Sequence, residues 1–352
     1  MFVEYFVVFL ILIVLDVYKR QTQYKLTSLG KIVLAVCLIG LFTLGLFIGK
    51  SIFANAGGST PAPNPPDSAV GAPIDGNDNG DSKDVQQDAA SGADNTQAPA
   101  STSAAVVPAL GYDESKLSAL DTKSSGWGFG NNVDENNRPI GSINAENAYS
   151  KYDADFIAPQ TKNVYLTIDE GYENGYTSKI LDVLKEKECP AVFFVTLSYV
   201  KSNPELVQRM INEGHVVGNH SSTHPSKGLP SQTIAEQAKE VTELHKYVKD
   251  NFGYDMYLFR FPAGIYSEQS LALVQELGYR SVFWSFAYRD WETDNQPDLA
   301  ASLAKLNSKM HEGAIYLLHA VSATNTEIMG QFIDDTRAAG YTFAIYPQSF
   351  SK

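Results

Sequence analysis

From Asn163 onward, short runs rich in β-branched and aromatic residues alternate with longer segments in which apolar residues recur at helical spacing. One such segment, Thr233–Asn251, places Ile234, Ala238 and Val241 on a single helical face. Seven strand-like runs stand between the helical segments: Val164–Ile168, Ala191–Val195, Val216–Val217, Tyr257–Phe259, Ser281–Trp284, Ile315–Leu318 and Thr342–Ile345. Because strands that alternate with helices pair in parallel, the pattern predicts an α/β fold built on a parallel sheet or barrel.

In parallel α/β folds, the functional side chains gather at the carboxyl ends of the strands. Polar side chains follow five of the predicted strands: Asp169 and Glu170 after the first, His220 and His224 after the third, Arg260 after the fourth, Asp290 after the fifth and His319 after the sixth. Taken singly, each has an ordinary structural reading, such as a solvated loop acid or a core histidine. Their shared position at strand ends is what predicts one site.

The residue types in this set favour metal-assisted hydrolysis. Two imidazoles and one carboxylate are common protein ligands for a catalytic zinc that keeps a position open for water. A second carboxylate, a third histidine and an arginine then remain for proton transfer and orientation. The other histidines, His215, His245 and His311, lie at a strand start, on a helix and in a turn, so we interpret them as structural.

The N-terminal part carries a candidate membrane anchor. The apolar run within residues 32–49, extended by its flanks, reaches the ~20 residues that a bilayer crossing needs. Four basic residues precede it, Lys19, Arg20, Lys25 and Lys31, so the positive-inside rule predicts that residues 1–31 are cytoplasmic and that the C-terminal domain is extracellular. The alternative is secretion after signal-peptide cleavage near Ala54-Asn55-Ala56. Residues 1–21 we interpret as a wrongly assigned start.

Residues 50–108 form the predicted linker, and 54–107 contain no aromatic side chain. A segment of this composition cannot bury enough apolar surface to offset its chain entropy, so we expect disorder. Its aspartates contribute to the formal net charge of −13, which argues against nucleic acid as a partner. Residues 109–162, with Trp127, Phe129 and Pro139, are predicted to be an ordered lead-in that packs on the domain formed by residues 163–352.

The chain has two cysteines, Cys37 within the apolar run and Cys189 alone in the globular part. Their positions give neither a disulfide framework nor a paired-cysteine metal site.

Five ordered motifs resemble those of the polysaccharide deacetylases, carbohydrate esterase family four: Thr167-Ile-Asp-Glu-Gly171, His220-Ser-Ser-Thr-His-Pro225, Arg260-Phe-Pro-Ala-Gly264, Arg289-Asp-Trp291 and Leu317-Leu-His319. The segments 171–176, 284–291 and 314–321 are similar to the delta-lactam-biosynthetic branch of that family. The resemblance implies a distorted (β/α) barrel that removes acetyl from N-acetylmuramic acid in peptidoglycan. In that branch this is the step before muramic δ-lactam forms in the spore cortex.

The resemblance also implies a role for each candidate residue. Asp169 is the expected base, oriented by Arg260, and His319 is the expected acid, with Asp290 as the candidate that orients it. A divalent metal, Zn²⁺ with Co²⁺ or Mn²⁺ as alternatives, is expected on three side chains: Glu170, His220 and His224. Peptidoglycan glycan strands are the expected partner, contacted by Tyr172, Pro262 and Trp291.

Two departures from the family pattern keep other readings open. The family has a second aspartate where this chain has Glu170, and many relatives have an aspartate where this chain has Ala287. One alternative is a deacetylase for N-acetylglucosamine in peptidoglycan or chitin-like polymers. Another is a non-catalytic wall-binding module with a degraded metal site.

Overall fold

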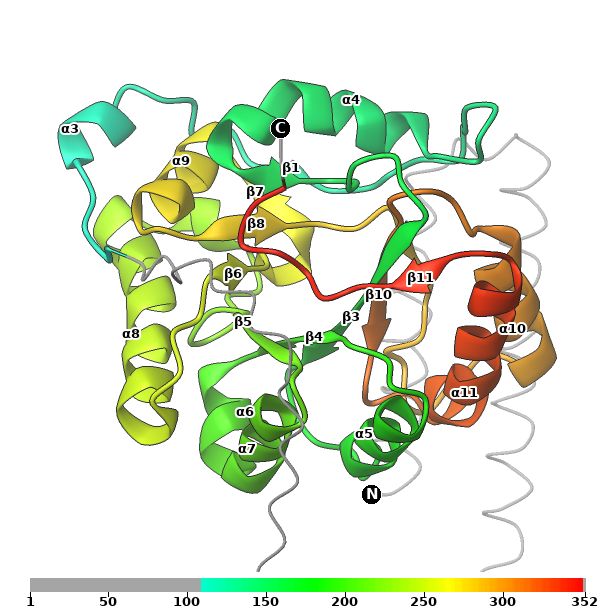
Figure 1. The fold of residues 1–352 in the computed structure, drawn as a ribbon. Coiled ribbons are helices and arrows are strands. Elements are labelled where there is room, and N and C mark those ends of the chain that lie inside the picture. Colours follow the sequence, from blue (N-terminus) through cyan, green and yellow to red (C-terminus); the bar gives the residue numbers. More distant parts are fainter. Residues whose placement is uncertain (1–108, 351–352) are drawn as a thin grey trace, which may run out of the picture. The chain divides into compact units, whose positions relative to one another are not determined.

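The computed structural model of the chain describes residues 109–350 (Figure 1). The predicted cytoplasmic segment, membrane anchor and linker, residues 1–31, 32–49 and 50–108, lie outside the described residues. Within 109–350, no helix has the length and apolar character needed to cross a membrane.

The described part of the chain is built on one parallel sheet of nine strands. In spatial order these are β2 (Ala154–Asp155), β8 (Arg280–Val282), β6 (Leu258–Phe259), β5 (Val216–Asn219), β4 (Val192–Val195), β3 (Asn163–Glu170), β10 (Ile315–His319) and β9 (Phe286–Ala287), with β11 (Thr342–Phe343) pairing with the start of β3. Every pairing within this sheet is parallel.

All seven predicted strands are therefore present, but the predicted barrel is incomplete. The order runs from β2 at one end to β9 at the other, and no hydrogen-bonded pairing joins these two among residues 109–350. The sheet is a curled half-barrel. Strands β2 and β9 were not predicted, because each has only two residues, lies outside the predicted runs and has no alternating pattern of its own.

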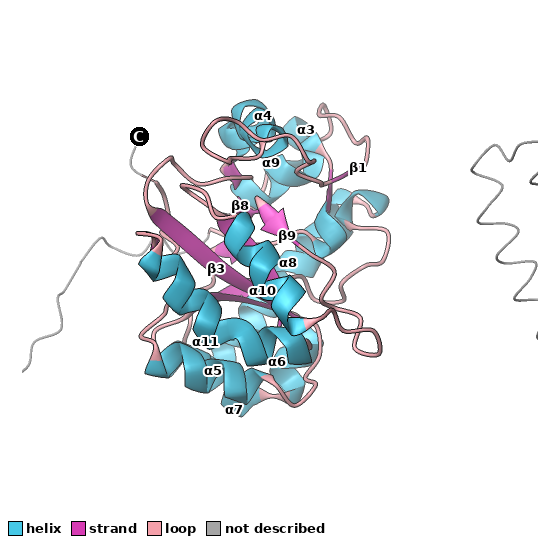
Figure 2. Ribbon diagram, turned by 90° about the vertical axis from the view of Figure 1, so that its right-hand side faces the viewer, coloured by secondary structure: helices cyan, strands magenta, loops and turns pink. Residues whose placement is uncertain are grey.

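The helices lie around the outside of the curled sheet (Figure 1). The longer ones are α4 (Ile140–Tyr149), α5 (Thr177–Glu186), α7 (Pro204–Asn212), α8 (Ile234–Phe252), α9 (Glu268–Glu276), α10 (Leu299–Ser308) and α11 (Ala323–Ala338). Shorter helical segments are α3 (Glu114–Leu117), η1 (Ser150–Tyr152), α6 (Leu197–Ser202), η2 (Leu229–Ser231) and η3 (Pro262–Gly264). Figure 2 shows α10 and α11 in front of the sheet and α5 below α11.

Alternation along the strands divides the buried apolar side chains into two clusters. In β3, Leu166 and Ile168 join the large cluster that also contains helix residues such as Leu181. Tyr165 joins the smaller cluster, which includes Phe194. Since successive side chains of a strand point to opposite faces, β3 presents one face to the helices and the other to the inside of the curl.

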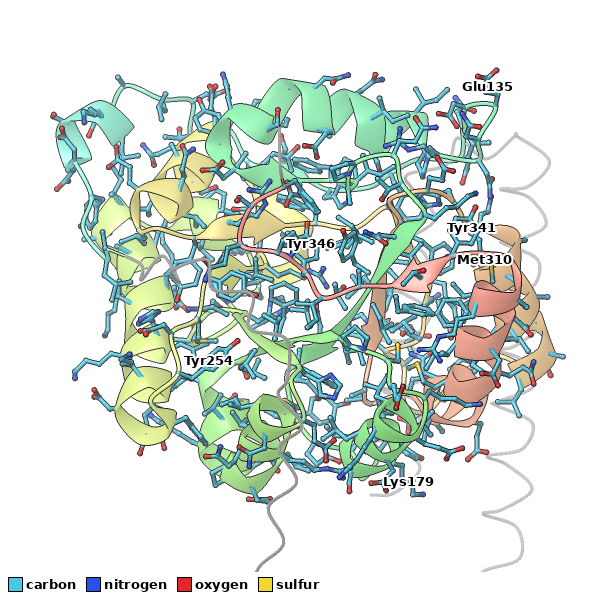
Figure 3. The ribbon with its side chains drawn as sticks, in the orientation of Figure 1. Glu135, Lys179, Tyr254, Met310, Tyr341 and Tyr346 are labelled. Atoms are coloured by element: carbon cyan, nitrogen blue, oxygen red, sulfur yellow. The ribbon has the colours of Figure 1, made fainter. Side chains whose placement is uncertain are left out.

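The lead-in and the C-terminal segment both join this fold. The lead-in supplies β2, and its β1 (Ser125–Gly126) pairs antiparallel with β7 (Ile265–Tyr266) in a separate two-stranded sheet. After β11, the chain (red in Figure 1) crosses the inside of the curl, where the Tyr346 ring packs against the Tyr165 ring in a tilted arrangement, with the centroids 4.9 Å apart. Figure 3 shows Tyr346 near the centre of the view.

Candidate active site

Asp169 and Glu170 are the last two residues of β3, and they point to opposite faces of the sheet. Asp169 lies on the face with Tyr165, inside the curl. Glu170 is fully buried on the helix face, where the Thr177 hydroxyl at the start of α5 donates to its Oε1 at 3.3 Å. Burial, followed by the neighbouring charges of Glu173 and Asp169, raises the pKa of Glu170 well above its ordinary value.

Asp169 is held as a carboxylate by the buried guanidinium of Arg260. Nη1 of Arg260 donates to Asp169 Oδ1 at 2.9 Å, while Nε and Nη2 donate to the carbonyl oxygens of Val282 and Phe283 at 3.0 and 3.1 Å. The guanidinium also stacks over the Phe194 ring, 4.2 Å from its centroid. Burial is the largest single influence on the pKa of Asp169 and would raise it, but the charge and hydrogen bond of Arg260, together with the charges of His220 and His319, outweigh burial and lower that pKa.

His220 and His224 lie side by side in the loop that follows β5. Their ring centroids are 4.9 Å apart, and Nε2 of His220 is 3.4 Å from Asp169 Oδ2. Nδ1 of His220 is 2.9 Å from the carbonyl oxygen of Arg260, which can only accept, so Nδ1 carries the proton. Nε2 therefore keeps its lone pair. Burial lowers the pKa of His220 to about 4, which keeps the imidazole neutral.

The loop that carries the two histidines is fastened to α8 by Glu240. Its carboxylate accepts from the Thr223 backbone N–H at 2.8 Å and from the Thr223 hydroxyl at 2.6 Å. The loop needs this support because both Ser221 and His224 have positive φ angles, 69° and 52°, in a region that costs energy for side chains other than glycine.

His319, the last residue of β10, is the register partner of Asp169 on the neighbouring strand. Its Nδ1 is 2.8 Å from Asp290 Oδ1, and its backbone N–H donates to Asp290 Oδ2 at 2.9 Å. Burial opposes the charged imidazolium, but the hydrogen bond and charge of Asp290 outweigh it, and the pKa of His319 is raised. Asn325, at the start of α11, donates to Asp290 Oδ2 at 2.6 Å and fixes the carboxylate further.

The predicted metal ligands are not brought together as a group of three. Among residues 109–350, no cluster of three histidine, cysteine or acidic side chains is arranged to hold a metal ion. The physical reason is strand alternation, because β3 continues through Glu170 and turns its side chain toward α5. The donors that remain, His220 and His224, still fit a metal through two imidazole rings 4.9 Å apart, a chemistry that suits zinc.

The predicted glycan-binding residues differ in exposure. Tyr172 is 54% exposed and Trp291 is 49% exposed, and the Trp291 ring lies 5.6 Å from the His319 ring, centroid to centroid. Pro262 is buried at the start of η3, so its side chain offers a glycan little surface.

The three histidines interpreted as structural make their hydrogen bonds away from this rim. His215 Nδ1 accepts from the Ala191 backbone N–H, His245 bonds the Tyr279 hydroxyl, and His311 bonds the Ser285 hydroxyl.

Sequence reasoning missed Asn325 and Glu240. Glu240 lies within a segment predicted as a helix, and Asn325 directly precedes another. A polar residue at either place normally faces solvent, and no local pattern marks these two as buried. Only their contacts with residues on other elements assign them to the site.

A carboxylate whose pKa is lowered opposite a histidine whose pKa is raised, beside two further imidazoles, defines the class of protein: a hydrolase equipped for acyl transfer. The chain belongs to the polysaccharide deacetylase family, whose enzymes act on N-acetyl amide bonds and in general depend on a metal. The polysaccharide deacetylase family model matches residues 157–282, a span that ends before His319 and begins after most of the lead-in.

Two relatives and two solved structures resemble most of the described chain. The peptidoglycan N-acetylmuramic acid deacetylase PdaA of Bacillus subtilis is 39% identical over 227 residues, 64% of this chain and 85% of the relative. An uncharacterised 30.6 kDa protein of Geobacillus stearothermophilus is 42% identical over 220 residues, 62% of this chain and 82% of the relative. The PdaA structure superposes with a TM-score of 0.60 at 38% identity, covering 64% of this chain and 95% of that one. A family 4 carbohydrate esterase from Bacillus anthracis superposes with a TM-score of 0.53 at 37% identity, covering 64% and 96%.

Proposed function

We propose that this protein hydrolyses the N-acetyl group of N-acetylmuramic acid residues in peptidoglycan and releases acetate. One observation carries the proposal. Asp169 and His319 are partners on neighbouring strands, and their surroundings push their pKa values in opposite directions. The similarity to a named N-acetylmuramic acid deacetylase, which spans 85% of that relative, supports the choice of substrate.

Asp169 is the proposed base. Its pKa is lowered, so at neutral pH it is ionised and can accept the proton of the attacking water. Arg260 keeps one carboxylate oxygen engaged at 2.9 Å, which fixes the orientation of the other. A base held in this way needs no rearrangement at the moment of reaction.

His319 is the proposed acid. An amine is a poor leaving group, so the nitrogen of the amide must receive a proton as its bond to the acetyl carbon breaks. Asp290 raises the pKa of His319, which favours the protonated imidazolium, and the hydrogen bond through Nδ1 leaves Nε2–H for the substrate. The half-exposed Trp291 beside His319 offers a flat apolar surface for a sugar ring.

His220 and His224 would hold the divalent metal, with Zn²⁺ proposed and Co²⁺ or Mn²⁺ as the metals to compare. When bound there, the metal supplies Lewis-acid polarisation of the acetyl carbonyl. Glu170 is left out of this ligand set because its carboxyl group lies on the other face of β3.

Muropeptide mass spectrometry tests the proposal directly. Purified protein is incubated with peptidoglycan, the glycan is digested, and the acetyl loss is assigned to one of the two sugars. The expected result is loss of acetyl from muramic acid, with release of acetate abolished in His319→Ala. Loss from glucosamine instead would favour the N-acetylglucosamine alternative. A peptidoglycan N-acetylglucosamine deacetylase of Listeria monocytogenes is 31% identical over 195 residues, 55% of this chain and 40% of that relative.

This substrate also requires the described residues to act outside the cell. The predicted anchor at residues 32–49 and a cleaved signal peptide would both deliver them there, with the anchored form as our proposal. Protease added to wall-permeabilised cells should release the catalytic domain from anchored protein, and protection until the membrane is lysed would refute an extracellular location.

A further inference from the structure

Arg260 is fully buried, and its position depends on two chain segments that follow neighbouring strands. The first segment, 260–264, follows β6 and carries the arginine itself. The second, 282–284, leaves β8 and offers the carbonyl oxygens of Val282 and Phe283 to the guanidinium. A buried guanidinium is stable only when each donor is satisfied, so the relative position of these segments sets where Arg260 points.

Trp127 in the lead-in connects the two segments. Its backbone N–H donates to the Gly264 carbonyl at 2.9 Å, and its indole Nε1–H donates to the Trp284 carbonyl at 2.9 Å. Three consecutive carbonyl oxygens, those of residues 282, 283 and 284, are thus held by two side chains. Arg260 takes the first two and Trp127 takes the third.

The packing around Trp127 leaves little room for either segment to shift. Its ring meets Phe156 at 4.6 Å and Phe283 at 6.1 Å between centroids. Gly264 has a left-handed φ of +64°, and a Cβ placed on it would come within 2.8 Å of the Trp284 ring and 3.2 Å of the Trp127 Cβ. The Trp284 ring in turn lies 5.7 Å from the guanidinium carbon of Arg260.

We propose that Trp127 is a positioning residue of the active site. It acts through Arg260, which orients Asp169, and does not itself touch substrate. The inference rests on the proposed function, because it takes Asp169 as the catalytic base. It makes the lead-in, most of which precedes the residues matched by the family model, a working part of the enzyme.

Trp127→Phe tests the proposal because it keeps an aromatic ring and removes the indole donor, and Trp127→Tyr provides a second variant of the same kind. The control is Tyr152→Phe, which removes another hydrogen bond of the lead-in, from the Tyr152 hydroxyl to Glu268 Oε1 at 2.6 Å. All proteins are compared at equal metal content, and their thermal unfolding midpoints are measured.

Two readouts are taken. The first is kcat and KM for acetate release from peptidoglycan. The second is independent of activity: the hydrogen-exchange rate of the Arg260 Nε–H, followed by nitrogen–proton NMR and assigned by its absence in Arg260→Lys. Loss of one ordinary hydrogen bond should raise the exchange rate and lower kcat by roughly fivefold each, with KM unchanged.

The control should match the wild-type protein in both readouts. Exchange within twofold of wild type in both Trp127 variants would overturn the proposal, whatever happens to kcat, because Arg260 would then be held without Trp127. A fall in kcat that merely follows a lower unfolding midpoint, with exchange unchanged, would also overturn it. A wild-type protein that releases no acetate from peptidoglycan would refute the proposed function alone, since the exchange measurement still decides the role of Trp127.

Discussion

Asp290→Asn tests the idea that a charged carboxylate keeps His319 protonated. The substitution preserves the shape of the side chain and one acceptor oxygen, so a hydrogen bond with the His319 Nδ1–H or backbone N–H can persist. What it removes is the negative charge 2.8 Å from the imidazole. His319 remains buried, and burial without a compensating charge disfavours the imidazolium.

The direction of the effect follows from this geometry. The hydrogen bond and charge of Asp290 raise the pKa of His319, so the variant should have a lower His319 pKa than the wild-type protein. An acid acts in its protonated form, and activity is lost as the pH rises through its pKa. The basic limb of the kcat/KM profile should therefore move to lower pH, and between the two pKa values kcat/KM should fall by at most the roughly 10²–10⁴-fold that a positioned acid contributes.

Stability provides a second measurement with a definite sign. Because the folded-state pKa of His319 is raised above its ordinary value of 6.5, the stability it contributes is fully present below that value. It is lost as the pH rises through the higher folded-state pKa. The difference in unfolding free energy between wild type and Asp290→Asn should therefore shrink between acidic and basic pH.

The assay is acetate release from peptidoglycan between pH 5 and 9, with an NMR titration of the His319 ring. Glu292→Gln is the matched control, because it removes one partly exposed charge from the same loop, where Glu292 pairs with Arg289. Its profile should overlie that of the wild-type protein. A basic limb that stays in place in Asp290→Asn would refute the reasoning, and equal movement in both variants would show that any loop charge suffices.

Three further outcomes are expected. Asp169→Asn should lower kcat by roughly 10²–10⁴ with metal content unchanged, as measured by acetate release and metal analysis, and near-normal turnover would remove Asp169 from the mechanism. Glu170→Gln should leave metal affinity unchanged in a titration and should raise stability to urea at pH 7 but not at pH 4. The reason is that the folded protein keeps Glu170 protonated while the unfolded chain ionises near 4.5, and a weaker metal affinity would restore Glu170 as a ligand. Gly264→Ala should lower the free energy of unfolding by at least ~1–2 kcal/mol, because the left-handed backbone alone costs that much and the new Cβ meets the Trp284 ring; an unchanged unfolding midpoint would contradict this.

The sequence alone determined the α/β class, the positions of the seven predicted strand-like runs and the edge of the sheet at which the site assembles. The class and the runs follow from local periodicity, and the position of the site follows because parallel strands share one direction, so that their carboxyl ends meet at one edge of the sheet. The rule that functional residues follow strands was enough to select Asp169, His220, Arg260 and His319 without knowledge of their contacts.

The tertiary structure decided what each of these side chains faces. Asp169 and Glu170 are adjacent, yet the point at which β3 ends determines whether the second carboxyl group joins the histidines or turns toward α5. The sequence does not mark that point, because polar residues at a strand end fit either continuation.

The residues that support the site were also beyond local reasoning. Trp127 bonds a carbonyl 157 positions further along the chain, and Asn325 bonds Asp290 from the start of a different element. Each is an ordinary aromatic or polar residue in its own segment. Its role exists only because folding brings distant segments to hydrogen-bond distance, and the energy of that contact depends on burial that no local pattern records.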